Sequence, residues 1–467
     1  MTRIMLIEPG TGTKDGVMRI LASIGTNKAD WKFPPLDLMG IGGILRKNGI
    51  EDFVILDSLN TGLTHAQTKQ RITEEKPELV IFTFTAYTAK NDMLVASAAK
   101  EVSKGIRTLA VNFAAESYPG SLMDDFPDLD YLAYHEPEYP CLDLVRSGYE
   151  PAGVCGIYYR NDGKVVKNPE RPLLDLDDIG VPAHDKIPLD IYRSPYQKRK
   201  PMSVTCFSRG CVNQCAHCLS KFLQPLRKRS YESIFEEFEL LRSLGVKELR
   251  FFDAELTCDM DWAEGLFEKM IEKKIDITFS CNTRADTVRP TLLEKMKKAG
   301  CHLLSIGVNS ADQQMLDNAG RNETVGQVLE AVKLIKKRGF RLTTFTTFGS
   351  KGETGETMRR TIRLIRDIDP DLASFSIAVP VLGTEFYDYL KKNGLLDESA
   401  PPEAYDPNLP PVYSYPGLSS REMYEISLQA YRSFYLRPAY IIKRLLRSYN
   451  RADDFKSLFY FLRRYVA

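Results

Sequence analysis

The sequence has 467 residues, of which 43% are hydrophobic, and this length corresponds to about three domains. Its 63 basic and 62 acidic residues leave a formal charge of +1, which excludes attraction of nucleic acid or anionic lipid by the overall field. Nine cysteines are too sparse for a disulfide framework, and no apolar run reaches the roughly eighteen residues of a membrane span. Because the N-terminus shows no signal-peptide pattern, we expect a cytoplasmic globular protein without a nucleic-acid partner.

Short β-rich runs alternate with helical stretches in the first third. The runs are residues 3–8, 53–56, 79–82 and 108–111, and the helical patterns are 36–47 and 89–103. This alternation predicts a Rossmann-like, doubly wound parallel α/β sheet over residues 1–150. Such sheets bind ligands at the carboxyl ends of their strands. The side chains expected there are Asp57, Ser58, Thr83, Thr85 and Asn112.

Residues 151–200 are predicted to be a hairpin and a linker. Within them, residues 156–167 are typical of a β-hairpin that turns at an Asn-Asp-Gly sequence. Residues 173–200 are rich in proline and aspartate and lack periodicity, which indicates a spacer between domains.

Four cysteines follow the short apolar run 202–205. They are Cys206, Cys211, Cys215 and Cys218, and the last three have the spacing C-x3-C-x2-C. Four thiolates usually close a [4Fe–4S] site, so three leave one iron open for a substrate or cosubstrate. A zinc site more often has two C-x2-C pairs, and only one is present, so zinc is the weaker alternative.

Strand-like and helical runs alternate again after these cysteines. The strand-like runs are 248–252, 276–280, 303–307, 341–345 and 373–377, separated by helical runs at 233–244, 262–273, 291–299, 325–338 and 356–367. With the strand before Cys206 they make six βα units. We therefore predict a partial (β/α)6 barrel over residues 201–390, since a complete barrel needs eight units.

The cysteine loop resembles that of the radical S-adenosylmethionine (SAM) enzymes. This resemblance implies that Cys211, Cys215 and Cys218 hold a [4Fe–4S] cluster whose open iron binds SAM. His217 occupies the position where the family usually has an aromatic residue beside the adenine. Cys206 lies outside the triplet and has no counterpart role.

The ends of the later barrel strands match the same family in order. Gly-Val-Asn-Ser replaces the usual Gly-x-Glu-Ser, and Gly-Ser-Lys-Gly-Glu-Thr replaces Gly-x-Pro-Gly-Glu-Thr. The resemblance implies SAM contacts from Phe252, Asp253, Glu255, Arg284, Asn309, Ser310, Gly349 and Glu353. Taken singly, Arg284 would be an ordinary salt-bridge partner and Gly349 an ordinary turn residue.

The first third resembles the cobalamin-binding domain that precedes one large class of radical SAM enzymes. The similarity rests on residues 34–45, 55–57 and 130–138. It implies that cobalamin lies at the edge formed by Asp57, Ser58, Thr83, Thr85 and Asn112. No D-x-H-x-x-G motif offers a histidine to cobalt, and residues 112–115 and 135–138 replace glycine-rich stretches. A retained fold without the cofactor is therefore the alternative, and His135 is interpreted as a surface or structural residue.

Residues 391–467 are predicted to be a helical C-terminal region. From residue 431 onward, nine lysines or arginines face two aspartates, and aromatic and aliphatic residues lie between them. This pattern favours a helical cap on the open side of the barrel. Peripheral contact with an anionic membrane surface is the alternative.

The resemblance also implies the reaction. One electron, from a donor such as flavodoxin or ferredoxin, passes through the cluster and cleaves SAM. The resulting 5′-deoxyadenosyl radical abstracts hydrogen from an unactivated carbon of a small-molecule or lipid substrate. With cobalamin the expected outcome is C-methylation, which makes the chain a methyltransferase. The alternatives are a non-methylating cyclase, rearrangement or C–C coupling enzyme, and a non-catalytic metal-binding interaction protein.

Overall fold

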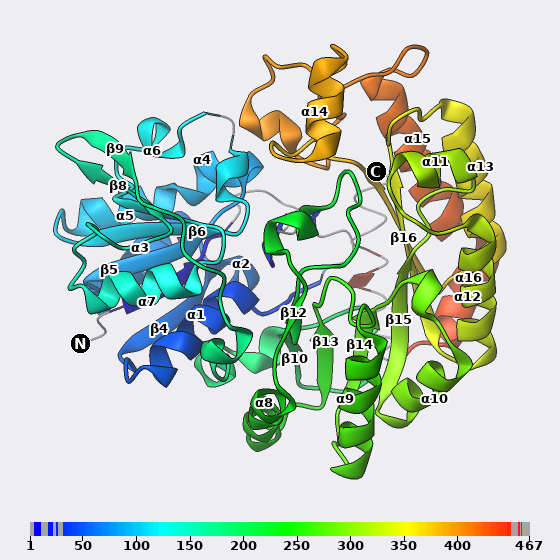
Figure 1. Cartoon of the computed structure of the whole chain (residues 1–467), viewed down its shortest axis with the longest axis horizontal. Coiled ribbons are helices and arrows are strands. Elements are labelled where there is room, and N and C mark those ends of the chain that lie inside the picture. Colours follow the sequence, from blue (N-terminus) through cyan, green and yellow to red (C-terminus); the bar gives the residue numbers. More distant parts are fainter. Residues whose placement is uncertain are drawn as a thin grey trace. The chain divides into compact units, whose positions relative to one another are not determined.

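The computed structural model describes residues 4–10, 17–21, 25–26, 31–118, 120–449, 456–457 and 459 (Figure 1). The chain forms two compact units that exchange segments along the sequence. The first unit comprises Met1–Asn27, Lys32–Tyr192 and Phe222–Gly245, and the second comprises Lys28–Trp31, Arg193–Lys221 and Val246–Ala467. The chain therefore enters the second unit, returns to the first, and leaves it again after residue 245.

A seven-stranded sheet forms the centre of the first unit. Its strand order is β4 (Phe53–Asp57), β1 (Ile4–Glu8), β5 (Leu79–Thr83), β6 (Arg107–Asn112), β7 (Tyr131–Tyr134), β8 (Ile157–Asn161) and β9 (Lys164–Lys167). The first five strands are parallel, and the last two are antiparallel. The predicted hairpin is thus present, and it extends this sheet at the edge.

Helices cover this sheet on both faces, as expected for a doubly wound fold. They are α1 (Leu36–Lys47), α2 (Ser58–Thr61), α3 (His65–Glu75), α4 (Ala89–Asp92), α5 (Leu94–Val102), α6 (Leu122–Asp125) and α7 (Glu138–Arg146), and α8 (Tyr231–Ser243) also belongs to this unit. Helix α1 packs beside α7, and α3 packs beside α5. Met5, Ile7 and Phe82 pack on the α5 side, so the alternating residues Leu6 and Ile81 face the other layer.

Six parallel strands form the sheet of the second unit. Their order is β10 (Met202–Thr205), β13 (Glu248–Phe251), β14 (Thr278–Asn282), β15 (Cys301–Gly307), β16 (Arg341–Phe348) and β17 (Leu372–Ile377). The order follows the sequence and runs linearly from β10 to β17, which makes an open half barrel as predicted. The helices after these strands in the second unit are α9 (Met260–Glu272), α10 (Pro290–Lys298), α11 (Gln313–Asn318), α12 (Val325–Lys337) and α13 (Gly355–Ile368).

The two faces of the half barrel differ in chemistry. The Phe251 ring stacks on Phe279, with centroids 4.4 Å apart, and Phe279 stacks on Phe267 of α9. This fully buried phenylalanine row marks the face that the helices cover. Because side chains alternate along a strand, Arg250 and Ser280 lie on the opposite face, where both are partly exposed.

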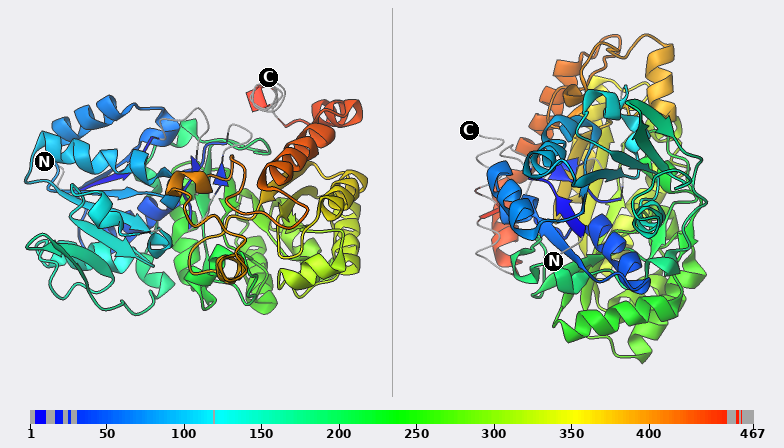
Figure 2. Two further views of the ribbon diagram at one scale, coloured as in Figure 1. Left: turned by 90° about the horizontal axis from the view of Figure 1, so that it is seen from above. Right: turned by 90° about the vertical axis from the view of Figure 1, so that its left-hand side faces the viewer.

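The C-terminal region begins with α14 (Glu385–Lys392) and ends in α15 (Ser420–Tyr435) and α16 (Pro438–Leu446). Helix α15 lies against α13 and β17 (Figures 1 and 2). The Tyr431 hydroxyl accepts a hydrogen bond from Phe375 N at 2.9 Å, so this helix does pack on the barrel. Most of the basic tail beyond residue 449 lies outside the described residues. None of the described helices combines the length and hydropathy required to cross a lipid bilayer.

Candidate functional site

The predicted metal ligands lie on the loop that follows β10. The thiols of Cys211, Cys215 and Cys218 are free and partly exposed. A hydrogen bond from Ala216 N to Ala319 O, at 3.1 Å, fixes the loop against a neighbouring turn. That turn needs glycine at position 320, because φ is +65° and a Cβ atom there would lie 3.1 Å from Gln214 O.

The sulfur atoms have distinct surroundings. Asn213 N donates to Cys211 Sγ at 3.5 Å, and Ser220 N donates to Cys218 Sγ at 3.5 Å. Cys258 was not predicted, yet its Sγ lies 3.8 Å from that of Cys211. The hydrogen bond from Cys258 and those from Asn213 lower the pKa of Cys211 to about 5. N–H groups directed at sulfur favour the thiolate, which is the form that binds metals.

The donor set fits a cluster better than a single ion. No three His, Cys, Asp or Glu side chains of the described residues converge closely enough to hold one metal ion. In a [4Fe–4S] cluster each thiolate binds a different iron, so three sulfurs spread along one loop are suitable.

Asp253 lies directly beyond β13 and is completely buried. Its Oδ1 accepts hydrogen bonds from Phe207 N at 3.1 Å and from Ser208 N at 2.6 Å. Burial raises its pKa to about 6, and Oδ2 has no hydrogen-bond partner in the protein. The neighbouring Phe252 ring is partly exposed. One oxygen of Asp253 therefore holds the start of the cysteine loop, and the other retains its capacity to accept a hydrogen bond.

Arg284 follows β14 and is at the centre of a charged cluster. Its Nη2 donates to Arg321 O at 2.7 Å and lies 3.6 Å from Glu323 Oε2. Glu323 also accepts from Arg321 Nε at 2.8 Å. Sequence motifs gave no signal for Arg321 and Glu323. The positive charges of Arg284 and Arg321 both act on Cys215, which places this cluster beside the cysteine loop.

Glu255 and His217 are the other predicted residues near this cluster. Burial raises the pKa of Glu255 to about 7, although Thr257 N donates to it at 3.2 Å and Arg284 opposes the rise. Burial and the charge of Arg321 lower the pKa of His217 to about 4. The imidazole is therefore neutral at pH 7.

The remaining predicted residues follow β15 and β16. Asn309 is buried, and Ser310 Oγ accepts from Asp312 N at 3.1 Å. The carbonyl oxygen of Gly349 accepts from the hydroxyl groups of Tyr413 and Tyr415, at 3.1 and 3.0 Å. Glu353 is buried and accepts a hydrogen bond from Thr357, and burial raises its pKa to about 7.

All of these residues lie at one edge of one sheet. They follow the carboxyl ends of β10, β13, β14, β15 and β16, where parallel βα folds place their active sites. The edge combines three thiols, two guanidinium groups and three buried carboxyl groups with raised pKa values.

The corresponding edge of the first unit is highly polar and internally bonded. Asp57 accepts from Asn60 N and from the Tyr192 hydroxyl, each at 2.9 Å. Thr83 Oγ1 donates to Glu8 at 2.6 Å. Ser58 Oγ is 2.9 Å from Thr68 Oγ1, Thr85 Oγ1 is 2.6 Å from Thr88 Oγ1, and Asn112 Nδ2 donates to Phe84 O at 2.5 Å. The sequence analysis did not identify the buried Arg19, which pairs with Glu8 at 2.9 Å and with Asp92 at 2.5 Å.

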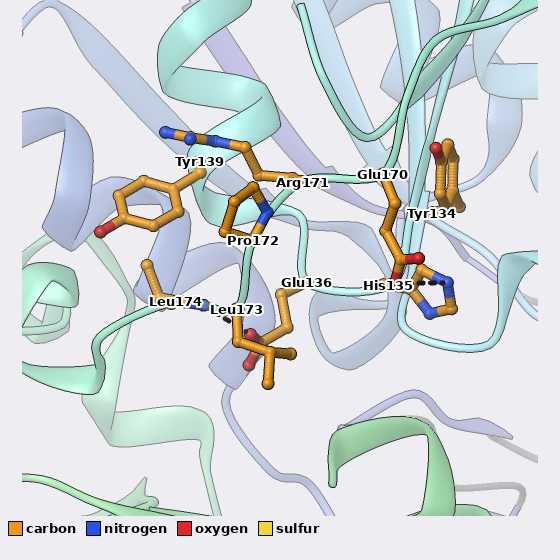
Figure 3. A pocket seen from close by; sticks show the side chains of 9 residues that line it. All are labelled: Tyr134, His135, Glu136, Tyr139, Glu170, Arg171, Pro172, Leu173 and Leu174. Atoms are coloured by element: carbon orange, nitrogen blue, oxygen red, sulfur yellow. Dashed lines mark hydrogen bonds and ion pairs between the residues drawn. The ribbon is translucent and has the colours of Figure 1, made fainter. Parts of the chain in front are cut away.

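A shallow hollow lies beside the end of β7, and Figure 3 shows the side chains that line it. His135 has φ of +60°, and its Nε2 lies 3.5 Å from Glu116 and 3.6 Å from Glu170. The other described histidines of this unit are also occupied, because His65 pairs with Asn91 and His184 with Glu237. Each described histidine of this unit therefore has a polar partner within the protein.

Residues 205–365 match the family model described as the radical SAM superfamily. This part of the chain is a radical SAM domain. This match begins at the last residue of β10 and contains the three cysteines and every predicted SAM contact. The recognition from the cysteine spacing is thus confirmed, whereas the individual SAM contacts stay predictions.

Relatives of this radical SAM protein match most of its length. An uncharacterised methyltransferase of Pyrococcus horikoshii is 29% identical over 455 residues, which cover 96% of this chain and 95% of the relative. An anaerobic magnesium-protoporphyrin IX monomethyl ester cyclase of Rubrivivax gelatinosus is 28% identical over 88% of this chain and 75% of its own.

Solved structures share the fold over most of the chain. The radical SAM methyltransferase TsrM from Kitasatospora setae, with cobalamin and a [4Fe–4S] cluster bound, has a TM-score of 0.71 at 17% identity and covers 94% of this chain and 92% of its own. The cobalamin-dependent radical SAM enzyme OxsB, with aqua-cobalamin bound, has a TM-score of 0.74 at 17% identity. The match covers 99% of this chain and 71% of the OxsB chain. These similarities confirm the predicted fold, a Rossmann-like sheet followed by a partial barrel.

Proposed function

We propose that this radical SAM protein is a cobalamin-dependent enzyme that methylates an unactivated carbon of a small molecule. One observation carries the proposal: a C-x3-C-x2-C loop at the carboxyl end of the first half-barrel strand follows a seven-stranded Rossmann-like sheet in the same chain. Relatives with this two-unit arrangement include a methyltransferase and a cobalamin-binding enzyme.

The predicted site residues have different roles in this proposal. Cys211, Cys215 and Cys218 would hold the cluster, and Arg284 with Asp253 would orient the charged methionyl groups of SAM. When bound, the cluster supplies the electron that cleaves SAM and cobalamin carries the methyl group. The protein contributes by fixing the partners close together and by excluding water. Hydrogen-atom abstraction requires no acid or base, so the arrangement needs no catalytic dyad.

The carboxyl edge of the first unit would hold cobalamin through Asp57, Ser58, Thr83, Thr85 and Asn112. These groups are already ordered by hydrogen bonds within the unit, so binding would require little reorganisation. A reducing flavodoxin or ferredoxin is the proposed electron donor. A lipid substrate and contact of the basic tail with anionic membranes belong to the same proposal and await their own tests.

The test is an anaerobic incubation of the reconstituted full chain with SAM, hydroxocobalamin and a strong reductant. We expect 5′-deoxyadenosine by mass spectrometry and corrin that stays bound through gel filtration. The matched control is Cys215→Ala, which should lose the cluster and the deoxyadenosine but keep the corrin, because the first unit is unchanged.

The outcomes separate the competing functions. Deoxyadenosine with retained corrin supports methylation and justifies a substrate search with methyl-labelled SAM. Deoxyadenosine without corrin contradicts the cobalamin part and favours a non-methylating cyclase or coupling enzyme. If neither appears, the enzymatic proposal fails and a metal-binding interaction protein takes its place.

A further inference from the structure

Arg250 lies in the middle of β13, on the face of the half barrel that the helices do not cover. Its neighbours in the sheet register are Ser280 on β14 and, beyond it, the strand that carries Ser305. Leu249 and Phe251, on either side of Arg250, are fully buried toward the helices. The guanidinium is therefore presented to the concave side of the sheet, three residues before Asp253.

The hydrogen bonds of Arg250 all go to neutral groups. Nη1 donates to Ser305 Oγ at 3.4 Å, and Nη2 donates to Asn282 Oδ1. A guanidinium has five N–H groups, so the described residues engage only two of them. None of the described carboxylates forms an ion pair with Arg250.

The nearby carboxyl groups form no ion pair with Arg250. Glu248, two residues earlier on the same face, binds His302 Nε2 at 2.6 Å and also Thr278. Asp253 attracts Arg250 electrostatically, but its Oδ1 is engaged by the cysteine loop and the two residues form no ion pair. The positive charge therefore lacks the direct partner that a desolvated cation normally requires.

Comparison with two other arginines of the chain makes the difference clear. Burial also disfavours the charged forms of Arg19 and Arg284. Their carboxylate partners have the larger combined effect, so the pKa values of both arginines are raised. For Arg250 burial dominates and the pKa is lowered. Arg250 is thus poised to gain stability from an anion that is not part of the protein.

We propose that Arg250 binds an anionic group of the substrate, a carboxylate or a phosphate-type oxyanion, on the concave face of the half barrel. This inference rests on the proposed function and names the substrate class. A planar guanidinium with free N–H groups matches the two oxygens of such an anion. The partly exposed rings of Phe252 and Phe345, on the same face, offer an apolar surface for the rest of the molecule.

The position also separates this group from the predicted SAM contacts. Those residues lie in the loops beyond the strand ends, whereas Arg250 belongs to the strand itself and sits deeper in the barrel. An anion at Arg250 would anchor the substrate below the strand ends and leave its carbon skeleton to extend toward the cysteine edge. Arg250 would then set which substrates bind, without taking part in the radical step.

The experiment is equilibrium dialysis of radiolabelled inorganic phosphate against the reconstituted full chain, with and without saturating SAM. The variants are Arg250→Gln, Arg250→Lys and, as a matched control, Arg363→Gln on the exposed side of α13. We expect Arg250→Gln to weaken phosphate binding about tenfold or more, Arg250→Lys less, and Arg363→Gln not at all. SAM affinity, measured separately with labelled SAM, should be the same in all four proteins.

Displacement of the phosphate by phenylphosphonate or by benzoate then tells which oxyanion the site prefers. The proposal is overturned if wild type binds no phosphate, if Arg250→Gln binds it equally well, or if SAM displaces it one for one. The last result would assign Arg250 to the SAM carboxylate. If phosphate binding depends on Arg250 but wild type produces no deoxyadenosine, the anion site stands and the proposed reaction fails.

Discussion

Cys206 differs from the three cysteines that follow it in what its sulfur contacts. Its thiol donates to Ser208 O at 2.9 Å, within its own turn. We expect Cys206→Ala to keep the full cluster content, because it removes one weak hydrogen bond worth less than about 1 kcal/mol. Alanine at Cys211, Cys215 or Cys218 should each remove most of the bound iron.

Iron and acid-labile sulfide per chain, measured after anaerobic reconstitution, check this prediction. Circular dichroism of the same samples shows whether each variant is folded. Loss of iron from folded Cys206→Ala would mean that the cluster uses a different set of three thiols.

Glu353 gives a prediction about pH. Burial raises its pKa from 4.5 to about 7, so the folded state holds the proton more tightly than the unfolded state does. Stability from this group is therefore greatest at low pH and falls as the pH rises from about 4.5 to 7. Glu353→Gln cannot ionise, so we expect its advantage over wild type to grow through this window, by about 3 kcal/mol at most.

The urea midpoint of both proteins, measured from pH 5 to 8, tests this expectation. Glu356→Gln is the matched control, because Glu356 is exposed and lies three residues later, in the first turn of α13. A constant difference between Glu353→Gln and wild type at every pH would show that the Glu353 carboxyl group does not titrate in this range.

At the scale of elements, two ion pairs fasten α16 to the end of α13. Asp369 has φ of +45° and binds Arg437 at 3.0 Å and Lys443 at 2.7 Å. Asp369→Asn keeps a residue that tolerates this backbone conformation but removes the charge. We expect α16 to open more often, with a loss of about 0.5–1 kcal/mol for these partly exposed pairs.

Hydrogen exchange of the backbone amides in α16 measures this opening. Exchange in α16 should be faster in Asp369→Asn than in wild type. It should be unchanged in Asp367→Asn, because Asp367 is an exposed residue of α13. Equal protection in all three proteins would show that apolar packing alone holds α16 in place.

Strands were easier to predict than several helices, for a physical reason. The six half-barrel strands are short apolar runs, and each run is present within one to three residues of its predicted limits. Helix α3 (His65–Glu75) buries only Thr68 and Ile72, so its sequence carries almost no helical periodicity. Strand β7 (Tyr131–Tyr134) was not predicted either.

The candidate site shows the same limit. The spacing of Cys211, Cys215 and Cys218 was readable because all three lie on one loop. Arg284 and Arg321 are in contact although they lie 37 positions apart, and no local sequence pattern indicates this contact. The sequence gives no signal for Arg250, because its hydrogen-bond partners Asn282 and Ser305 lie on other strands, far away in the sequence.

At the scale of the whole molecule, the first unit depends on a segment that comes after the cysteine loop. Glu237 on α8 binds His184 Nε2 at 2.9 Å and also Arg229, and all three are essentially buried. Glu237→Ala leaves Arg229 without its carboxylate, which should cost the first unit about 3–5 kcal/mol. Glu239→Ala, exposed on the same helix, should cost little.

Thermal unfolding of the full chain, with bound corrin as a marker for the first unit, distinguishes these variants. We expect Glu237→Ala to release corrin at a lower temperature than wild type and Glu239→Ala to release it at the wild-type temperature. Release at the same temperature in all three would mean that the buried pair adds nothing to this unit.

The exchange of segments between the units also fixes an order of events during synthesis. A ribosome delivers the chain from the N-terminus, so residues 32–192 emerge long before residues 222–245 that complete their unit. Between the two segments lie all three cysteines of the loop, and they emerge before β13 to β17 do. The thiols thus leave the ribosome ahead of the later half-barrel strands, so the proposed cluster has an interval in which it can be assembled on the loop before the sheet beside it is complete.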